Sequence, residues 1–188
     1  AFHNYSPLVA AVTNIDAEHL DTYKNLAGVK RGFVRYFSNI VPGGAFVLNQ
    51  DDANLYSLAE DIESIAQAKD VTVIWCSSLG EQEDDKDLVK KIKKIIKIPG
   101  AHNISNALAA VHVGLYLNIP LTTCLAAIGK YNGAWRRMEY RGELTLAGTA
   151  GDKGKSLSVP VYDDYGHHPT EIRATLQGFR EKFPHHRL

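Results

Sequence analysis

Leu8-Val9-Ala10-Ala11-Val12-Thr13-Asn14 is an apolar run that ends in two polar residues. A strand buried on both faces of a parallel sheet has this composition, because helices cover the sheet on both sides. Two runs of the same kind follow at residues 45–48 and 71–76, and the first of these leads into the polar Asn49. The three runs are therefore predicted to be strands of one buried sheet.

The segments between these runs have the spacing of amphipathic helices. Apolar residues recur every three or four positions from residue 26 to 40, before Pro42-Gly43-Gly44, and again from residue 55 to 65. Strand and helix alternate, which predicts an α/β fold with a mostly parallel sheet and right-handed crossovers. The repeating positions are Leu26, Val29, Phe33, Phe37 and Ile40 in the first segment, and Leu55, Leu58, Ile62 and Ile65 in the second.

The second half of the chain changes character. Lysines alternate with apolar residues from 86 to 97, after an acidic stretch, which predicts a solvated surface helix, with a membrane or RNA surface as the alternative. Two further helices are expected at 104–117 and 121–131. Residues 140–146 and 157–161 are strand-like and lead to a helix whose core face carries Ile172, Leu176, Phe179 and Phe183. We expect two domains, residues 1–134 and 135–188.

Composition limits the possible environments and partners. Of the 188 residues 45% are hydrophobic, and 21 acidic residues balance 21 basic ones, so no global field recruits nucleic acid or anionic lipid. No apolar stretch has the length of a membrane span. Cys76 and Cys124 lie in apolar runs without Cys-x-x-Cys spacing, so reduced thiols in a reducing cytoplasm are expected.

Tyr162-Asp163-Asp164-Tyr165-Gly166-His167-His168-Pro169-Thr170-Glu171-Ile172, the signature segment, holds the densest chemistry of the chain. It joins the end of a predicted buried strand at residues 159–161 to the start of a helix, and α/β folds bind ligands at such corners. A simple turn with a polar helix entry is the alternative. Two carboxylates, a phenol and two imidazoles in one turn favour a site.

Residues 148–156 resemble a phosphate-binding loop only superficially. The pattern requires Gly where Thr149 stands, and Ser156 leads into a strand rather than a helix. This segment is predicted to be a hairpin tip.

Four segments in one order resemble the Mur ligase family. Two belong to that family's ATP-binding domain, one to the domain junction, and the last is the signature segment. The first three are Thr13-Asn14-Ile15-Asp16-Ala17-Glu18-His19-Leu20-Asp21, Pro99-Gly100-Ala101-His102-Asn103-Ile104-Ser105-Asn106-Ala107-Leu108-Ala109-Ala110, and the arginine segment Gly133-Ala134-Trp135-Arg136-Arg137-Met138-Glu139.

The resemblance implies the end of a P-loop-type ATP-binding domain, lacking its P-loop, followed by the start of a Rossmann-like C-terminal domain. Residues 77–98 are shorter than the corresponding part of the family. The family's phosphate loop and UDP-binding domain lie upstream of the first segment. The chain is therefore expected to be a fragment that is inactive on its own.

The implied activity is that of an ATP-dependent ligase of peptidoglycan precursor synthesis, which joins L-alanine to UDP-N-acetylmuramate through an acyl phosphate, with ATP and Mg²⁺ as cofactors. Tyr165-Gly166 favours this branch over the branch that adds a whole peptide. The alternatives are a murein-peptide, cyanophycin or folylpolyglutamate type ligase, or a non-catalytic remnant that binds a nucleotide or a partner.

The resemblance also implies a role for each matching residue. His19 would hold the metal and act in catalysis, although a solvent-exposed loop histidine is the alternative. Arg137 would contact the transferring phosphate, with Arg136 structural and Asp163 orienting an imidazole. The remaining expected site residues are His102, Asn103, Asn106 and Asp164 for the nucleotide, with helix capping by Asn103 as the alternative, and Tyr165 and His167 for the incoming amino acid.

Overall fold

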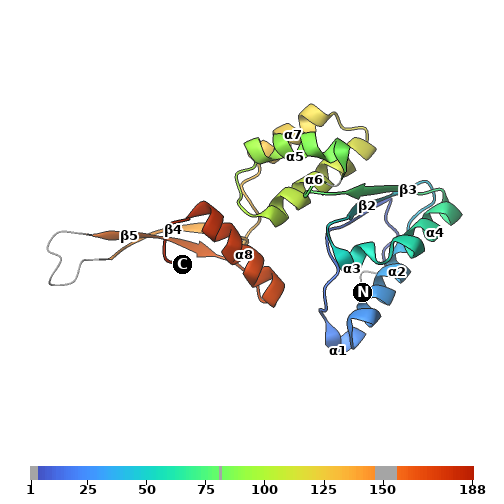
Figure 1. The fold of residues 1–188 in the computed structure, drawn as a ribbon, viewed down its shortest axis with the longest axis horizontal. Helices are drawn as coiled ribbons and strands as arrows, with labels where there is room; N and C mark the ends of the chain where they lie inside the picture. Colours follow the sequence, from blue (N-terminus) through green and yellow to red (C-terminus); the bar gives the residue numbers. More distant parts are fainter. Residues whose placement is uncertain (1–3, 81, 147–155) are drawn as a thin grey trace. The chain divides into compact units, whose positions relative to one another are not determined.

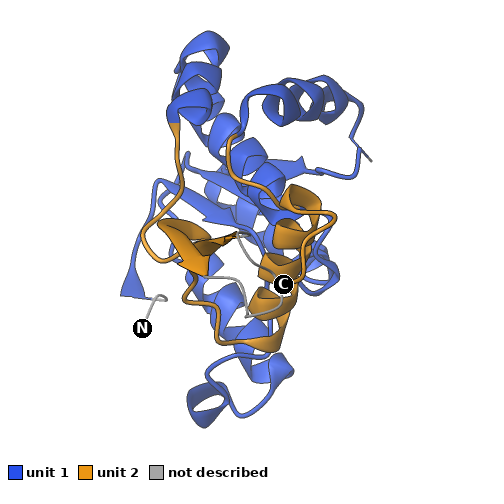
Figure 2. Ribbon diagram, turned by 90° about the vertical axis from the view of Figure 1, so that its left-hand side faces the viewer, with its two compact units in different colours: residues 1–96, 101–130 blue, residues 97–100, 131–188 orange. Residues whose placement is uncertain are grey.

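The computed structural model describes residues 4–80, 82–146 and 156–188 of the chain (Figure 1). The chain forms two compact units. The first comprises Ala1–Ile96 and Ala101–Lys130, and the second comprises Lys97–Gly100 and Tyr131–Leu188 (Figure 2). In the described part of the chain, no helix has the length and apolarity required to cross a membrane.

The first unit is built on a three-stranded parallel sheet, which confirms the predicted fold class. Its strands are β1 (Val9–Val12), β2 (Ala45–Asn49) and β3 (Thr72–Cys76), in that order across the sheet. Val9 pairs with Ala45, which in turn pairs with Thr72. The first four residues of the central strand are completely buried, as a strand covered on both faces requires.

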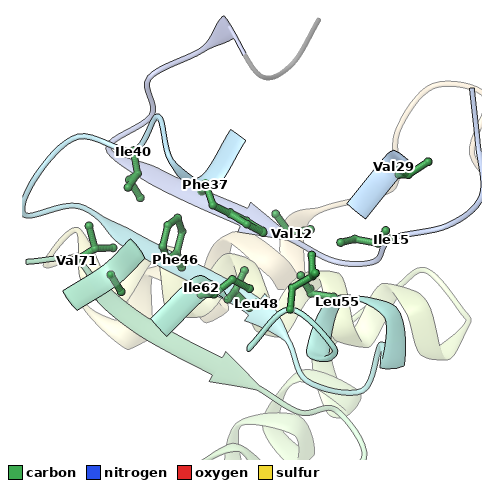
Figure 3. Packing of buried hydrophobic residues seen from close by; sticks show 13 residues of the cluster. Val12, Ile15, Val29, Phe37, Ile40, Phe46, Leu48, Leu55, Ile62 and Val71 are labelled. Atoms are coloured by element: carbon green, nitrogen blue, oxygen red, sulfur yellow. The ribbon is translucent and has the colours of Figure 1, made fainter. Parts of the chain in front are cut away.

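Helices cover both faces of this sheet. Phe46 and Leu48 of β2 face one hydrophobic cluster (Figure 3). Val47 faces another, because successive side chains of a strand point to opposite sides. The first cluster includes residues of α2 (Leu26–Phe37), α3 (Ala53–Tyr56) and α4 (Ala59–Lys69). The second includes residues of α5 (Glu83–Ile95), α6 (Ala101–Tyr116) and α7 (Leu121–Lys130).

The periodic segment at residues 55–65 is not one helix, as predicted, but parts of two. Asp52 caps the start of α3, and α3 ends at its C-cap Ser57, before α4 begins. The amide of Leu58 donates to the carbonyl of Leu55, the tighter bonding that ends a short helix. Leu55 and Leu58 are both buried, so the apolar spacing indicates which side chains are buried but not where the helix breaks.

The second unit contains a hairpin and a helix. Strands β4 (Glu139–Leu146) and β5 (Leu157–Asp163) pair antiparallel, and α8 (Pro169–Lys182) follows. The ring of Tyr162 packs edge-on against Phe179 and Phe183, with centroids 5.0 and 5.8 Å away. The predicted hairpin tip lies at residues 148–156, almost wholly outside the described residues.

Two expectations about this unit are wrong. The end of β5 is not a buried strand, since Val161 is 42% exposed, and the predicted core face of α8 is only half covered. Ile172 and Leu176 remain 44% and 50% exposed. A two-stranded hairpin and one helix offer too little apolar surface to bury both faces of either element.

Candidate functional site

In the second unit, the arginine segment and the signature segment are bonded to each other. The amide of Tyr165 donates to the carbonyl of Arg136 at 2.8 Å. The Asp164 carboxylate accepts from the amide of Met138 through Oδ2 at 2.9 Å and from the amide of Gly166 through Oδ1 at 2.7 Å. Two segments that are far apart in sequence thus form one braced corner.

The side chain of Arg137 pairs with a residue of α8. Its Nη2 donates to Oε1 of Glu171 at 2.9 Å, with side chains 47% and 28% exposed respectively. Within residues 4–80, 82–146 and 156–188, the structure shows no second polar partner for this guanidinium. Arg137 therefore retains N–H donors that can pair with an anion.

Arg136 is engaged differently. Its guanidinium lies 4.7 Å from the centroid of the Tyr165 ring, and its Nε is 3.6 Å from Oδ2 of Asp163. Asp163, which was expected to orient an imidazole, thus pairs with an arginine instead. The physical reason is proximity: Glu139, two residues beyond Arg137, is the direct partner of Asp163 in the β4–β5 ladder.

Glu171 is the residue of this corner to which the sequence interpretation gave no role. Its Oε2 accepts from the amides of His167 at 3.3 Å and His168 at 3.5 Å, and His168 and Glu171 form a capping box at the start of α8. The sequence signal was available: a glutamate three residues after the N-cap position is typical of this motif. The pairing with Arg137, 34 residues away, has no local signal.

Tyr165 and His167 lie beside each other at the exposed side of the corner. Their rings meet edge-on with centroids 5.2 Å apart. Nδ1 of His167 is 3.1 Å from the carbonyl oxygen of Tyr165. A carbonyl only accepts, so Nδ1 carries the hydrogen in this contact and the neutral imidazole keeps its lone pair on Nε2.

In the first unit, the loop after β1 is held by residues that follow β2. Nδ2 of Asn49 donates to the carbonyl of Thr13 and Nδ2 of Asn54 to that of Ile15, both at 2.9 Å. The amide of Ile15 donates to Oδ1 of Asp52 at 3.2 Å. These three side chains fix the loop that leads to His19, and the sequence interpretation gave none of them a role in the site.

His19 begins the short helix α1 (Leu20–Tyr23) in a left-handed backbone conformation, with φ of 53°. Its side chain is exposed. Among the described residues, no three His, Cys, Asp or Glu side chains gather in a cluster that could hold a metal ion. Mg²⁺ bound to a nucleotide takes most of its ligands from phosphate oxygens and water and only one or two from the protein, so the expected role of His19 does not require such a cluster.

His102, Asn103 and Asn106 lie in the first two turns of α6. This helix begins at Ala101, so Asn103 is its third residue and not its N-cap. His102 and Asn103 are half-buried and Asn106 is exposed. The two amides are three residues apart and share one side of the helix.

The Mur ligase middle domain matches residues 2–114, more than half of the chain. The chain belongs to the Mur ligase family. It is 33% identical to UDP-N-acetylmuramate–L-alanine ligase of Bdellovibrio bacteriovorus and 35% identical to that of Desulfatibacillum aliphaticivorans, in each case over 100% of this chain and 41% of the relative. The chain thus spans about two fifths of the length of these relatives.

The fold of this Mur ligase chain is also found in solved structures. The crystal structure of MurF from Acinetobacter baumannii aligns with a TM-score of 0.64 at 19% identity, covering 94% of this chain and 38% of that one. The matched middle domain contains His19, His102, Asn103 and Asn106, which lie in the first unit. Arg137, Asp164, Tyr165 and His167 follow it and lie in the second unit.

Proposed function

We propose that the intact protein is an ATP-dependent ligase that joins L-alanine to UDP-N-acetylmuramate in the cytoplasm, during peptidoglycan precursor synthesis. The relatives that carry this activity in their names match the whole length of the chain. The observation that carries the proposal furthest is the corner that brings an arginine, a carboxylate, a phenol and an imidazole together.

The first chemical step suits Arg137. A carboxylate oxygen of the muramyl group attacks the γ-phosphorus of ATP, ADP leaves, and an acyl phosphate forms. Charge develops on the phosphoryl oxygens, and a guanidinium with free N–H donors stabilises that charge by pairing with two oxygens at once.

The residues proposed for the nucleotide are His102, Asn103 and Asn106 of α6, and Asp164 of the signature segment. The amides of Asn103 and Asn106 can donate to and accept from the adenine edge, with His102 next to them. Asp164 would accept from a ribose hydroxyl. Each of its oxygens already accepts one backbone N–H, and each has a second lone pair for a ligand.

The second step suits Tyr165 and His167. The amine of L-alanine attacks the acyl carbon, a tetrahedral intermediate collapses, and phosphate leaves as the amide forms. The attacking amine must lose a proton. Nε2 of His167 is the unprotonated nitrogen when Nδ1 donates to the Tyr165 carbonyl, so it can accept a hydrogen bond from the incoming ammonium group.

Mg²⁺ would neutralise the phosphates when bound. His19 is the proposed protein ligand, at the end of the loop fixed by Asn49, Asp52 and Asn54. In the intact enzyme, His19→Ala should weaken turnover at low magnesium, and added magnesium should partly restore the rate. Unchanged kinetics at low magnesium would show that His19 is an exposed loop residue with no role in metal binding.

The test of the activity is phosphate release by the intact protein. Release should require ATP, UDP-N-acetylmuramate and L-alanine together. Activity only with a peptide or with glutamate in place of L-alanine would assign another Mur-type ligase. ATP binding without any release, in the presence of each of these amines, would assign a non-catalytic module.

A further inference from the structure

Glu171 links the two halves of the candidate active site. One carboxylate oxygen accepts from the Arg137 side chain, and the other accepts from the amides of His167 and His168. Nδ1 of His167 lies 3.7 Å from that second oxygen. The proposed phosphate-binding arginine and the proposed amine-binding histidine therefore share one carboxylate.

Helix capping does not account for this arrangement. A capping box needs a single bond from the glutamate to the backbone N–H of the N-cap residue, here His168. A glutamate with that role alone can leave its second oxygen in water. In this structure the oxygen that does not cap the helix, Oε1, accepts from Arg137, and the side chain is 28% exposed.

The charge of Glu171 fits a partner of an arginine. Its partial burial on its own would raise its pKa. The hydrogen bond and charge of Arg137, together with the amides of His167 and His168, outweigh this effect and leave the pKa below its usual range. The group is thus a carboxylate at neutral pH, and its bond to Arg137 is charge-assisted.

We propose that Glu171 is a positioning residue of the ligase, which holds the Arg137 guanidinium in the orientation that meets the transferring phosphoryl group and fixes the backbone of His167 beside it. This inference rests on the proposed function. A long arginine side chain that is 47% exposed has many rotamers, and a fixed carboxylate partner reduces them before ATP binds.

The deciding variant is Glu171→Gln in the intact protein. Glutamine preserves the capping box, so α8 should remain folded, but it removes the charge opposite Arg137. We expect kcat to fall about tenfold while the KM for ATP changes by less than about twofold, because the loss is one of orientation rather than of binding. Glu181→Gln, an exposed substitution on the same helix, should leave both constants unchanged.

A double-mutant cycle separates positioning from folding. In an Arg137→Ala background, Glu171→Gln should reduce the remaining kcat by less than about twofold, because the group through which it acts is gone. An equal fold-loss in both backgrounds, or no loss in the wild-type background, would overturn the proposal.

A readout without catalysis tests Glu171 even if the ligase activity is absent. Phenylglyoxal forms its adduct at the guanidinium nitrogens, and the charge-assisted bond from Nη2 to the Glu171 carboxylate keeps that nitrogen from the reagent. The modification rate of the peptide containing Arg137, measured by mass spectrometry, should rise about threefold in Glu171→Gln and stay constant in Glu181→Gln. Equal rates in wild type and Glu171→Gln would contradict the proposal, whereas failure of phosphate release in wild type would contradict only the function.

Discussion

Arg136 and Arg137 are adjacent in sequence but have different surroundings. Arg136 has a left-handed backbone, with φ of 53°, and its guanidinium stacks on Tyr165. Arg137 pairs only with Glu171 among the described residues and keeps donors for a ligand. The turn at Arg136 therefore directs the Arg136 side chain onto Tyr165, whereas the Arg137 side chain keeps N–H donors for a ligand.

Replacement of Arg137 by lysine should reduce kcat/KM of the intact enzyme about a hundredfold, or about 3 kcal/mol, because lysine keeps the charge but loses the two-pronged donor. Steady-state kinetics of phosphate release measures this change. Arg141→Lys is the matched control, since Arg141 is also half-exposed and pairs with a glutamate, Glu139, on β4. Equal effects of both substitutions would show that Arg137 does not belong to the active site.

Cys76 should be inert in the folded protein. Burial, followed by the nearby charges of Asp85 and Asp51, raises the pKa of this thiol to about 12, so almost no thiolate exists at pH 8. Iodoacetamide should leave the Cys76 peptide unmodified in the native protein and label it after denaturation, as read by mass spectrometry. Cys124, which is only partly buried, should react first. Labelling of Cys76 in the native protein as fast as Cys124 would show that the structure around Cys76 opens.

At the scale of elements, α1 and α2 are held close by a glycine. A Cβ atom at Gly28 would overlap the carbonyl oxygen of Tyr23, a backbone atom that cannot move without its helix. The amide of Gly28 also donates to Oδ1 of Asn25, the cap of α2. The absence of a side chain at Gly28 therefore sets where α1, and His19 at its start, can lie.

Gly28→Ala should destabilise the protein by about 1–3 kcal/mol, the usual cost of overpacking, and should reproduce the magnesium dependence of His19→Ala. Chemical denaturation and magnesium titration of turnover measure the two effects. Gly129→Ala in α7 is the control: its new Cβ would meet Ile95 at an ordinary 3.7 Å, so stability should hold or rise. A Gly28→Ala protein as stable as wild type would show that α1 moves freely.

How well each helix or strand could be predicted from the sequence depended on how completely it is buried. Strands β1, β2 and β3 were located to within a residue, because a strand covered on both sides is a continuous apolar run. The break between α3 and α4 was missed, because both flanking leucines are buried. For β5 and α8, apolar residues were assigned to a core that the described residues of their unit do not supply.

The candidate site was predictable to the extent that its residues are local. The signature segment and the arginine segment were recognised from their sequences, and the corner they form joins them through backbone bonds. Asn49, Asp52, Asn54 and Glu171 were given no role, because their partners lie 34 to 39 residues away in sequence. Such contacts depend on the folded chain and leave no periodic pattern.

At the scale of the whole first unit, a buried polar group connects layers of the fold. Asp85 of α5 is 2% exposed and accepts from the amide of Ser77 after β3 at 2.7 Å. Its other oxygen lies 2.7 Å from Nε2 of His112 on α6. One carboxylate thus joins the sheet edge to two helices on the side of the sheet that carries Asn103 and Asn106.

Asp85→Ala should lower the free energy of unfolding by about 3–5 kcal/mol, because it leaves the Ser77 amide and the His112 ring without their partner in a buried place. Urea denaturation measures the loss. Asp84→Ala, exposed in the same first turn of α5, controls for the favourable effect of negative charge at a helix start and should cost less than about 1 kcal/mol. Similar losses for both would show that the Asp85 pair adds nothing to that effect.

The alternation of β2 has a consequence for how this unit can vary. Phe46 and Leu48 belong to the cluster beneath the helix on which α1 rests, whereas Val47 belongs to the cluster beneath α6. The two clusters lie on opposite faces of the sheet and share no side chain among the described residues. Mutations that repack one cluster therefore need not disturb the other. The loop that leads to His19 and the helix that carries Asn103 can therefore change independently during evolution, while the central strand keeps both in register.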